Sequence, residues 1–245
     1  MKLRRAGGIL PEIHNFYGEF KMKVVQCWDD GVVTDLRVIE LLYKYNAKAT
    51  FNLCPGLMND ERIPSHWAEA GYKGWSHRGF FGGHIGKKEL YDVYKDFQVA
   101  SHCWCHEVAG RVPDDVFIKG AVDARKYLED VFGRECRGFA WPCSGNTPET
   151  CDLLRENGFA YARVVGNTDD VTSFTDPMLL TPNCHFQAPD FYERYEKAKA
   201  TGVFYFWGHS YEMLDSDGLL GQLEHKIAWI SNDPDAEWAD VIDII

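Results

Sequence analysis

Short apolar segments alternate with longer amphipathic ones along nearly the whole chain. Segments such as 23–28 and 203–208 are rich in β-branched and aromatic residues and have the length of buried strands. The segments between them show helical periodicity, as in 34–46 and 113–133. About seven such alternations, with no linker or low-complexity stretch, are typical of a parallel sheet covered by helices. The pattern predicts one α/β domain over residues 1–245 with a parallel, barrel-like sheet; a doubly wound open sheet is the alternative.

The element boundaries follow from apolar runs, caps and glycines. Thr34 is a candidate N-cap for the first helix, and Gly133 ends the longest one. The predicted strands are 23–28, 47–53, 97–102, 137–141, 159–165, 178–186 and 203–208, with a last strand in 239–245. The predicted helices are 34–46, 87–96, 113–133, 147–158, 189–202 and 217–231.

The charge balance excludes several classes of partner. Lys and Arg number 26 against 37 Asp and Glu, which gives a net charge of −11. Nucleic acid and an anionic membrane are therefore not expected as partners. No G-x-G-x-x-G follows the first predicted strand and no G-x-S-x-G occurs, so neither a dinucleotide site nor a serine hydrolase is indicated.

The chain start and the cysteines bear on the compartment. The basic opening has only Ile9 and Leu10 before Pro11, which is too short for a secretory signal. We therefore expect a cytoplasmic protein, or one from which a leader has been removed. The eight cysteines lie mostly in apolar runs and form no C-x-x-C, so reduced, buried thiols are expected rather than a disulfide framework or a zinc ribbon.

Unusual polar residues gather where the predicted strands end. The carboxyl ends of parallel strands meet at one rim, which is where such folds collect their chemistry. The residues in these positions are Asp29, Asp30, Ser101, His102, Pro142, Cys143, Arg163, His185 and His209.

Two of these sites together predict a metal centre. Asp29 and Asp30 are adjacent like charges, which are costly at a strand end unless a cation lies beside them. His102 and His106 are four residues apart, a spacing that on a helical turn places both imidazoles on one face. Two imidazoles and one carboxylate leave an open position on a divalent ion. One aspartate would then be a ligand, and its neighbour would be free for proton transfer. Taken singly, a solvated turn at 29–31 and a core histidine at 209 are the alternatives.

At these residues the chain resembles the polysaccharide deacetylase family, carbohydrate esterase family four, with its nodulation-type deacetylase domain. The resemblance extends from about residue 23 to about 230 and rests on several ordered motifs. It implies an incomplete (β/α)7 barrel and a metal-dependent enzyme. In the family's Asp-Asp-Gly motif the first aspartate is the general base and the second a metal ligand, which implies these roles for Asp29 and Asp30. The other implied ligands are His102 and His106, and the implied general acid is His209.

Two family motifs depart in this chain. Cys103 stands where the second motif has Ser or Thr, and "AWPC" replaces Arg-Pro-Pro-Tyr. The resemblance implies that the backbone N–H of Cys143 helps to hold the oxyanion. The arginine that orients the base must come from elsewhere. Arg163 ends its strand at the correct rim, whereas Arg137 begins a strand at the opposite end, so Arg163 is preferred.

The resemblance implies removal of acetyl groups from an N-acetylated sugar or oligosaccharide. An O-acetyl esterase acting on xylan or a related glycan is the alternative, and a non-catalytic glycan-binding relative is the third candidate. The expected cofactor is one divalent ion, with zinc preferred and cobalt, nickel or manganese possible on ligand chemistry. Trp75, Trp141 and His185 are candidate substrate contacts, with core packing as the alternative for the two tryptophans and a structural role as the alternative for His185. Glu212 is a candidate to orient His209, with an exposed turn residue as the alternative.

Overall fold

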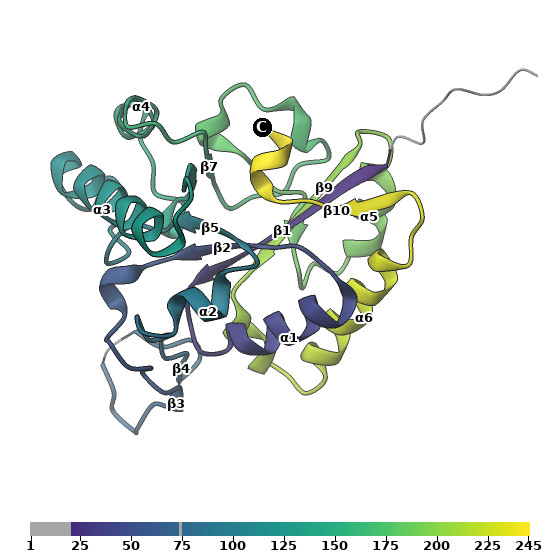
Figure 1. Ribbon diagram of the computed structural model, residues 1–245. Helices are drawn as coiled ribbons and strands as arrows, with labels where there is room; N and C mark the ends of the chain where they lie inside the picture. Colours follow the sequence, from purple (N-terminus) through teal and green to yellow (C-terminus); the bar gives the residue numbers. More distant parts are fainter. Residues whose placement is uncertain (1–20, 74) are drawn as a thin grey trace, which may run out of the picture.

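The computed structural model describes residues 21–73 and 75–245, and its centre is a curled parallel sheet (Figure 1). Seven strands follow the order β7-β6-β5-β2-β1-β9-β8, and β10 lies beside β1. Within the described residues no ladder joins β7 to β8, so the barrel is incomplete, as the resemblance implies. The strands are β1 (Met22–Asp30), β2 (Thr50–Leu53), β5 (Gln98–Ser101), β6 (Gly138–Ala140), β7 (Tyr161–Arg163), β8 (Cys184–His185), β9 (Val203–Gly208) and β10 (Ala236–Trp238).

β1 is the longest strand and the axis of the sheet. Its first half pairs with β10 and its second half with β2 on the same edge, while β9 pairs along the other edge. Val24, Val25 and Trp28 are fully buried. Burial on both faces explains the nearly continuous apolar run that precedes the two aspartates.

Helices cover the outside of the sheet, as Figure 1 shows. Thr147 caps its helix through a reciprocal pair of hydrogen bonds with Thr150, and Gly133 ends the longest helix with a φ of 63°. Thr34 occupies the N-cap position of the first helix, as predicted, but its side chain makes no capping hydrogen bond and its hydroxyl contacts the Ser210 hydroxyl at 2.7 Å instead. The helices are α1 (Asp35–Tyr45), α2 (Leu90–Tyr94), α3 (Asp114–Phe132), α4 (Pro148–Glu156), α5 (Phe191–Ala198) and α6 (Leu219–Ser231).

Two segments differ from the prediction. The last strand is Ala236–Trp238, not 239–245, and Val241–Ile244 forms a 3-10 turn instead. The irregular segment before α2 contains a short antiparallel pair, β3 (His66–Trp67) and β4 (Phe80–Phe81). The segment that follows β4 lies beside the turn that follows β1, where the Ile85 N–H donates to the Gly31 carbonyl at 3.2 Å.

All eight cysteines are free thiols, and only Cys105 and Cys143 are exposed. Reduced, mostly buried thiols are therefore what the fold contains, as predicted. Among the described residues, no helix combines the length and apolarity needed to cross a membrane. The chain start, with Ile9, Leu10 and Pro11, lies outside the described residues.

Candidate metal centre and active site

The end of β1 carries both aspartates and turns sharply after them. Asp30 has a φ of 83°, which is uncommon for a residue other than glycine, and Gly31 follows with a φ of 69°. A Cβ at Gly31 would lie 2.6 Å from the Met58 side chain and 3.0 Å from Leu53. Glycine therefore follows the aspartates for two reasons, conformation and space.

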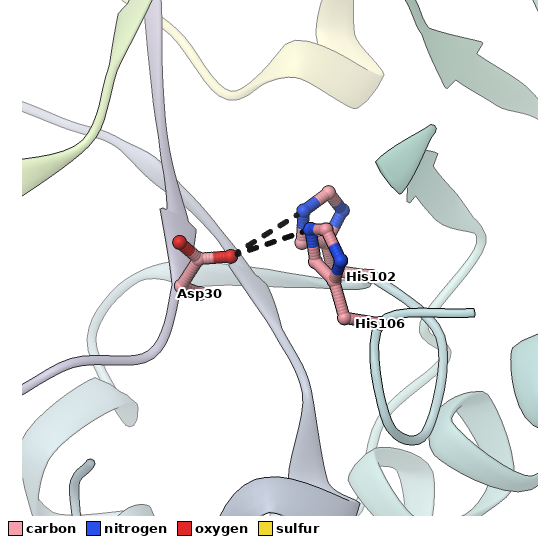
Figure 2. Close-up of side chains that lie close together, drawn as sticks. All are labelled: Asp30, His102 and His106. Carbon is pink, nitrogen blue, oxygen red and sulfur yellow. Dashed lines mark ion pairs between the residues drawn. The ribbon is translucent and has the colours of Figure 1, made fainter. Parts of the chain in front are cut away.

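Asp30 faces two histidines, as Figure 2 shows. Its Oδ1 lies 3.6 Å from His102 Nε2 and 3.8 Å from His106 Nε2. Ligands about 2.0–2.2 Å from a tetrahedral ion are roughly 3.4 Å apart, so one cation would fit between these three atoms with little adjustment. Tyr211 donates its hydroxyl to the other Asp30 oxygen at 3.2 Å, which fixes the carboxylate.

The hydrogen bonds around His102 prepare it as a ligand. Its Nδ1 lies 2.8 Å from the Ala140 carbonyl, which only accepts, so Nδ1 carries the proton and Nε2 presents its lone pair to Asp30. Burial lowers the pKa of His102 to about 4, which keeps the ring neutral. A carboxylate and a neutral imidazole in this arrangement are the donor set that zinc takes.

The two histidines are not on a helical turn, contrary to the prediction. His102 directly follows β5, and the loop after it contains left-handed residues at Cys103, with a φ of 63°, and His106, with a φ of 61°. The tight loop still brings the two rings together, with centroids 4.8 Å apart. The spacing of the two histidines therefore predicts correctly that their rings are close, but the cause is a tight loop and not a helical turn.

Asp29 is buried against a guanidinium and an amide. Arg163 donates to both of its oxygens, with 2.5 Å to Oδ1, and Asn52 Nδ2 donates to Oδ1 at 2.7 Å. The Asp29 and Arg163 side chains are 2% and 1% exposed. Burial alone would raise the pKa of the Asp29 carboxyl, but the Arg163 charge, with His102 and His209, holds it well below its usual range. Asp29 is therefore ionised, and the structure places Arg163 where the sequence predicted it.

His209 follows β9 and lies between Asp29 and Glu212. Its Nε2 is 3.8 Å from Asp29 Oδ2, and its Nδ1 is 3.3 Å from Glu212 Oε1. Tyr211 stacks on the ring at 5.0 Å between centroids. Burial favours the neutral ring, but the adjacent Glu212 carboxylate and the Asp30 and Asp29 charges outweigh it and raise the pKa of His209 to about 9. The imidazole therefore holds a proton at neutral pH and is able to donate it.

The predicted substrate contacts have three different surroundings. Trp141 is 1% exposed, stacks on Phe117 and donates its Nε1–H to the Met178 carbonyl at 2.8 Å. It is a core residue, so the predicted sugar contact is wrong. Trp75 is 61% exposed and lies edge-on to Tyr211, with centroids 5.6 Å apart, so its ring is available beside the site.

His185 and Cys143 lie at the rim. His185 lines a surface hollow of about 840 Å³ and hydrogen-bonds Glu212. Cys143 has an exposed side chain and a left-handed φ of 52° in the turn after β6. The backbone of this turn follows a strand that ends at the same rim as β1, which is where an oxyanion contact would be needed.

The sequence reasoning missed three residues of the site or weighed them too low. Asn52 is the register partner of Asp29 on β2, so an amide at a strand end was the available signal. Glu212 is not an exposed turn residue but an inward-facing one, with its side chain 16% exposed. Tyr211 had no signal, because only the turn after β9 brings it to Asp30 and His209.

The fold and the site together define an incomplete barrel with a cluster of carboxylates, imidazoles and a guanidinium at the carboxyl ends of its strands. A family model described as polysaccharide deacetylase matches residues 19–162, which is more than half of the chain. The chain therefore belongs to the polysaccharide deacetylase family, carbohydrate esterase family four. Comparison with curated proteins found no match.

Solved structures share the fold at low identity. A candidate polysaccharide deacetylase from Mycobacterium smegmatis is 16% identical over 99% of this chain and 93% of that one, with a TM-score of 0.60. The Bc1960 peptidoglycan N-acetylglucosamine deacetylase is 13% identical over 93% and 89%, with a TM-score of 0.56. A family 4 acetyl xylan esterase from Clostridium thermocellum, in complex with cobalt, is 17% identical over 91% and 89%, with a TM-score of 0.53. The match to the Streptococcus pyogenes deacetylase PplD spans only 58% of this chain and 55% of that one.

Proposed function

We propose that this protein is a metal-dependent deacetylase that removes acetyl groups from an N-acetylated sugar or oligosaccharide. One observation carries the proposal: an ionised buried carboxylate, Asp29, and a protonated histidine, His209, lie 3.8 Å apart beside a set of cation ligands. At neutral pH the Asp29 carboxylate is therefore able to accept a proton and the His209 imidazolium is able to donate one, which are the protonation states that acid–base hydrolysis needs.

Asp30, His102 and His106 would hold the ion. When bound, a divalent ion would supply Lewis-acid polarisation and lower the pKa of a bound water. Zinc is preferred for this ligand set, with cobalt, nickel and manganese as alternatives. Tyr211 on the outer Asp30 oxygen and the Ala140 carbonyl on His102 keep the two ligands oriented in advance.

Asp29 is the proposed general base. Arg163 and Asn52 fix the orientation of its carboxylate, and the Arg163 charge keeps it in the form that accepts a proton. A carboxyl with so low a pKa is a weak base, so it depends on the attacking water being unusually acidic. This dependence couples the base to the neighbouring cation site.

His209 is the proposed general acid, and its Nε2 faces Asp29 across the site. It would donate its proton to the departing amine, because an amide nitrogen is a poor leaving group until it is protonated. The backbone N–H of Cys143 is the proposed donor to the oxyanion that forms on the acetyl carbonyl.

The substrate side of the site favours a carbohydrate. Trp75 offers an exposed ring from the segment between β3 and β4, next to Tyr211, and sugars stack on such aromatic faces. An O-acetyl ester is the second candidate, because the same base and acid would act on it and a fold neighbour is an acetyl xylan esterase. Only the leaving group differs between the two reactions.

Acetate release tests the proposal. The purified chain, stripped with a chelator and reloaded with zinc, cobalt, nickel or manganese, is incubated with chitooligosaccharides and with acetylated xylan. We expect release from chitooligosaccharides that requires the ion and disappears in Asp29→Asn. Release from acetylated xylan alone would favour the esterase. No release from either substrate with any of the four ions would favour a non-catalytic glycan-binding protein.

A further inference from the structure

A second group of potential ligands lies beside the first. His185, His209 and Glu212 have donor atoms within 4.8 Å of one another. His185 Nε2 is 2.8 Å from Glu212 Oε2, and His209 Nδ1 is 3.3 Å from Glu212 Oε1. Glu212 therefore lies between the two histidines: its Oε2 hydrogen-bonds His185, and its Oε1 is at ion-pair distance from His209.

The tautomer of His185 decides what this cluster does. The backbone N–H of Gln187 donates to His185 Nδ1 at 3.2 Å, so that nitrogen carries no proton. The ring proton then lies on Nε2 and is donated to Glu212. The arrangement is the reverse of that at His102, where Nδ1 is the donor and Nε2 presents a lone pair. His185 is therefore prepared as a hydrogen-bond donor to a carboxylate and not as a ligand for a second ion.

The strand end that carries His185 holds Glu212 at more than one point. The Gln187 side chain donates to the Glu212 main-chain carbonyl at 3.1 Å, in addition to the His185 bond to the carboxylate. The His209 main-chain N–H also donates to Glu212 Oε2, at 2.9 Å. Two donors on Oε2 leave Oε1 directed at His209 Nδ1. Burial would raise the pKa of Glu212, but its bonds to His185 and His209 hold it well below the usual range, so the bridge is an anion.

We propose that His185 is a positioning residue for the general acid: its Nε2–H holds Glu212, and the Glu212 carboxylate, paired with His209 at Nδ1, orients that ring so that its Nε2 faces the leaving group. This inference rests on the proposed function. It replaces the predicted substrate contact of His185 with an indirect role. Without the His185 donor, Glu212 Oε2 keeps only the His209 main-chain N–H, so the carboxylate is held less firmly against the His209 ring.

Leaving-group dependence separates positioning of an acid from a merely structural role. An amine leaving group needs the acid, whereas the 4-nitrophenolate of 4-nitrophenyl acetate departs without a proton. The zinc-loaded full chain is assayed for kcat/KM on chitotetraose, acetylated xylan and 4-nitrophenyl acetate. The variants are His185→Phe, which keeps an aromatic ring but no donor, and His185→Gln, whose amide keeps a donor. His209→Ala is the reference, and His225→Phe on the exposed face of α6 is the matched control.

We expect His185→Phe to lower kcat/KM on the glycan about tenfold to a hundredfold, a loss typical of removing a residue that orients another functional side chain. Loss of the acid itself costs about 10²–10⁴-fold. The variant should keep its rate on 4-nitrophenyl acetate to within about threefold, and His185→Gln should recover most of the glycan activity. Equal losses on glycan and aryl ester, no loss on the glycan, or a glutamine variant as impaired as phenylalanine would each overturn the inference. A wild-type chain inactive on all three substrates would instead overturn the proposed function.

Discussion

Replacing Arg163 with methionine would leave a buried carboxylate without the guanidinium that contacts it. The Asp29 and Arg163 side chains are 2% and 1% exposed, and Arg163 also lies over the Trp207 ring at 5.0 Å. In Arg163→Met the remaining partners of Asp29 are the Asn52 amide, at 2.7 Å, and the more distant His209 imidazolium, at 3.8 Å. Neither replaces the two hydrogen bonds and the close positive charge that the guanidinium supplies to a buried carboxylate. The variant should therefore be both less stable and less active.

The size of the effect follows from the burial of the pair. Removing one partner of a buried ion pair costs about 3–5 kcal/mol, because the other charge loses its closest counter-charge. In a protein of this size, about 1 kcal/mol corresponds to roughly 2–4 °C, so the melting temperature should fall by roughly 6–20 °C. The pKa of Asp29 should also rise, because the Arg163 charge is the main contribution that opposes burial. The acidic limb of the pH–rate profile should move to higher pH.

Urea unfolding of the metal-free protein measures the free energy of unfolding for four proteins. These are the wild type, Arg163→Met, Asp29→Asn and the double variant. The double variant should be within about 2 kcal/mol of the wild type, because removing both charges avoids the desolvation cost. Arg137→Met is the matched control, since Arg137 is an exposed arginine next to β6. A loss below about 1 kcal/mol in Arg163→Met, or losses that simply add in the double variant, would refute the reasoning.

Three further predictions test other parts of the site. His102→Ala should lose the ion, whereas Asp29→Asn should keep it and lose turnover; elemental analysis of the dialysed proteins checks both, and equal metal loss would contradict the assigned roles. Burial raises the pKa of Asp35 to about 7 despite hydrogen bonds to its carboxyl. Because the folded state binds this proton more tightly, the contribution to stability is full below about pH 4 and is lost as pH rises to about 7. In Asp35→Asn, the free energy of unfolding, measured by urea unfolding between pH 4 and pH 7, should decline by up to about 4 kcal/mol less than in the wild type. The same pH dependence in both proteins would contradict the raised pKa of Asp35. Trp75→Ala should raise KM about threefold to tenfold with little change in kcat, while Trp67→Ala, on strand β3 of the same hairpin, should not; an equal effect of both would argue against stacking at Trp75.

Strand ends were the most predictable part of the protein. Val203–Gly208 was predicted to the residue, and Asp30, His102 and Arg163 were all placed at one rim because parallel strands share their direction. That reasoning needs only the order of elements. It does not need the exact turn geometry, which is why it succeeded even where the loop carrying the histidines was wrongly expected to be helical.

Contacts that depend on turn conformation were not predictable in the same way. Tyr211 and Glu212 reach Asp30 and His209 because the chain turns tightly after β9, and a sequence pattern does not encode the direction of that turn. Trp141 was misplaced for a related reason. A tryptophan after a strand is equally compatible with a substrate wall and with the core, and only packing against Phe117 distinguishes them.

The two adjacent aspartates face one site because Asp30 has an uncommon backbone conformation. Alternation along a strand sends neighbouring side chains to opposite faces, so Asp29, on the Asn52 side, and an extended Asp30 would point apart. The φ of 83° at Asp30 breaks this alternation and directs its carboxylate to His102. A left-handed residue of this type costs about 1–3 kcal/mol and persists only where the surroundings fix it. The Tyr211 hydroxyl on Asp30 and the guanidinium on Asp29 provide that restraint, so the two like charges are held by different partners while facing one site.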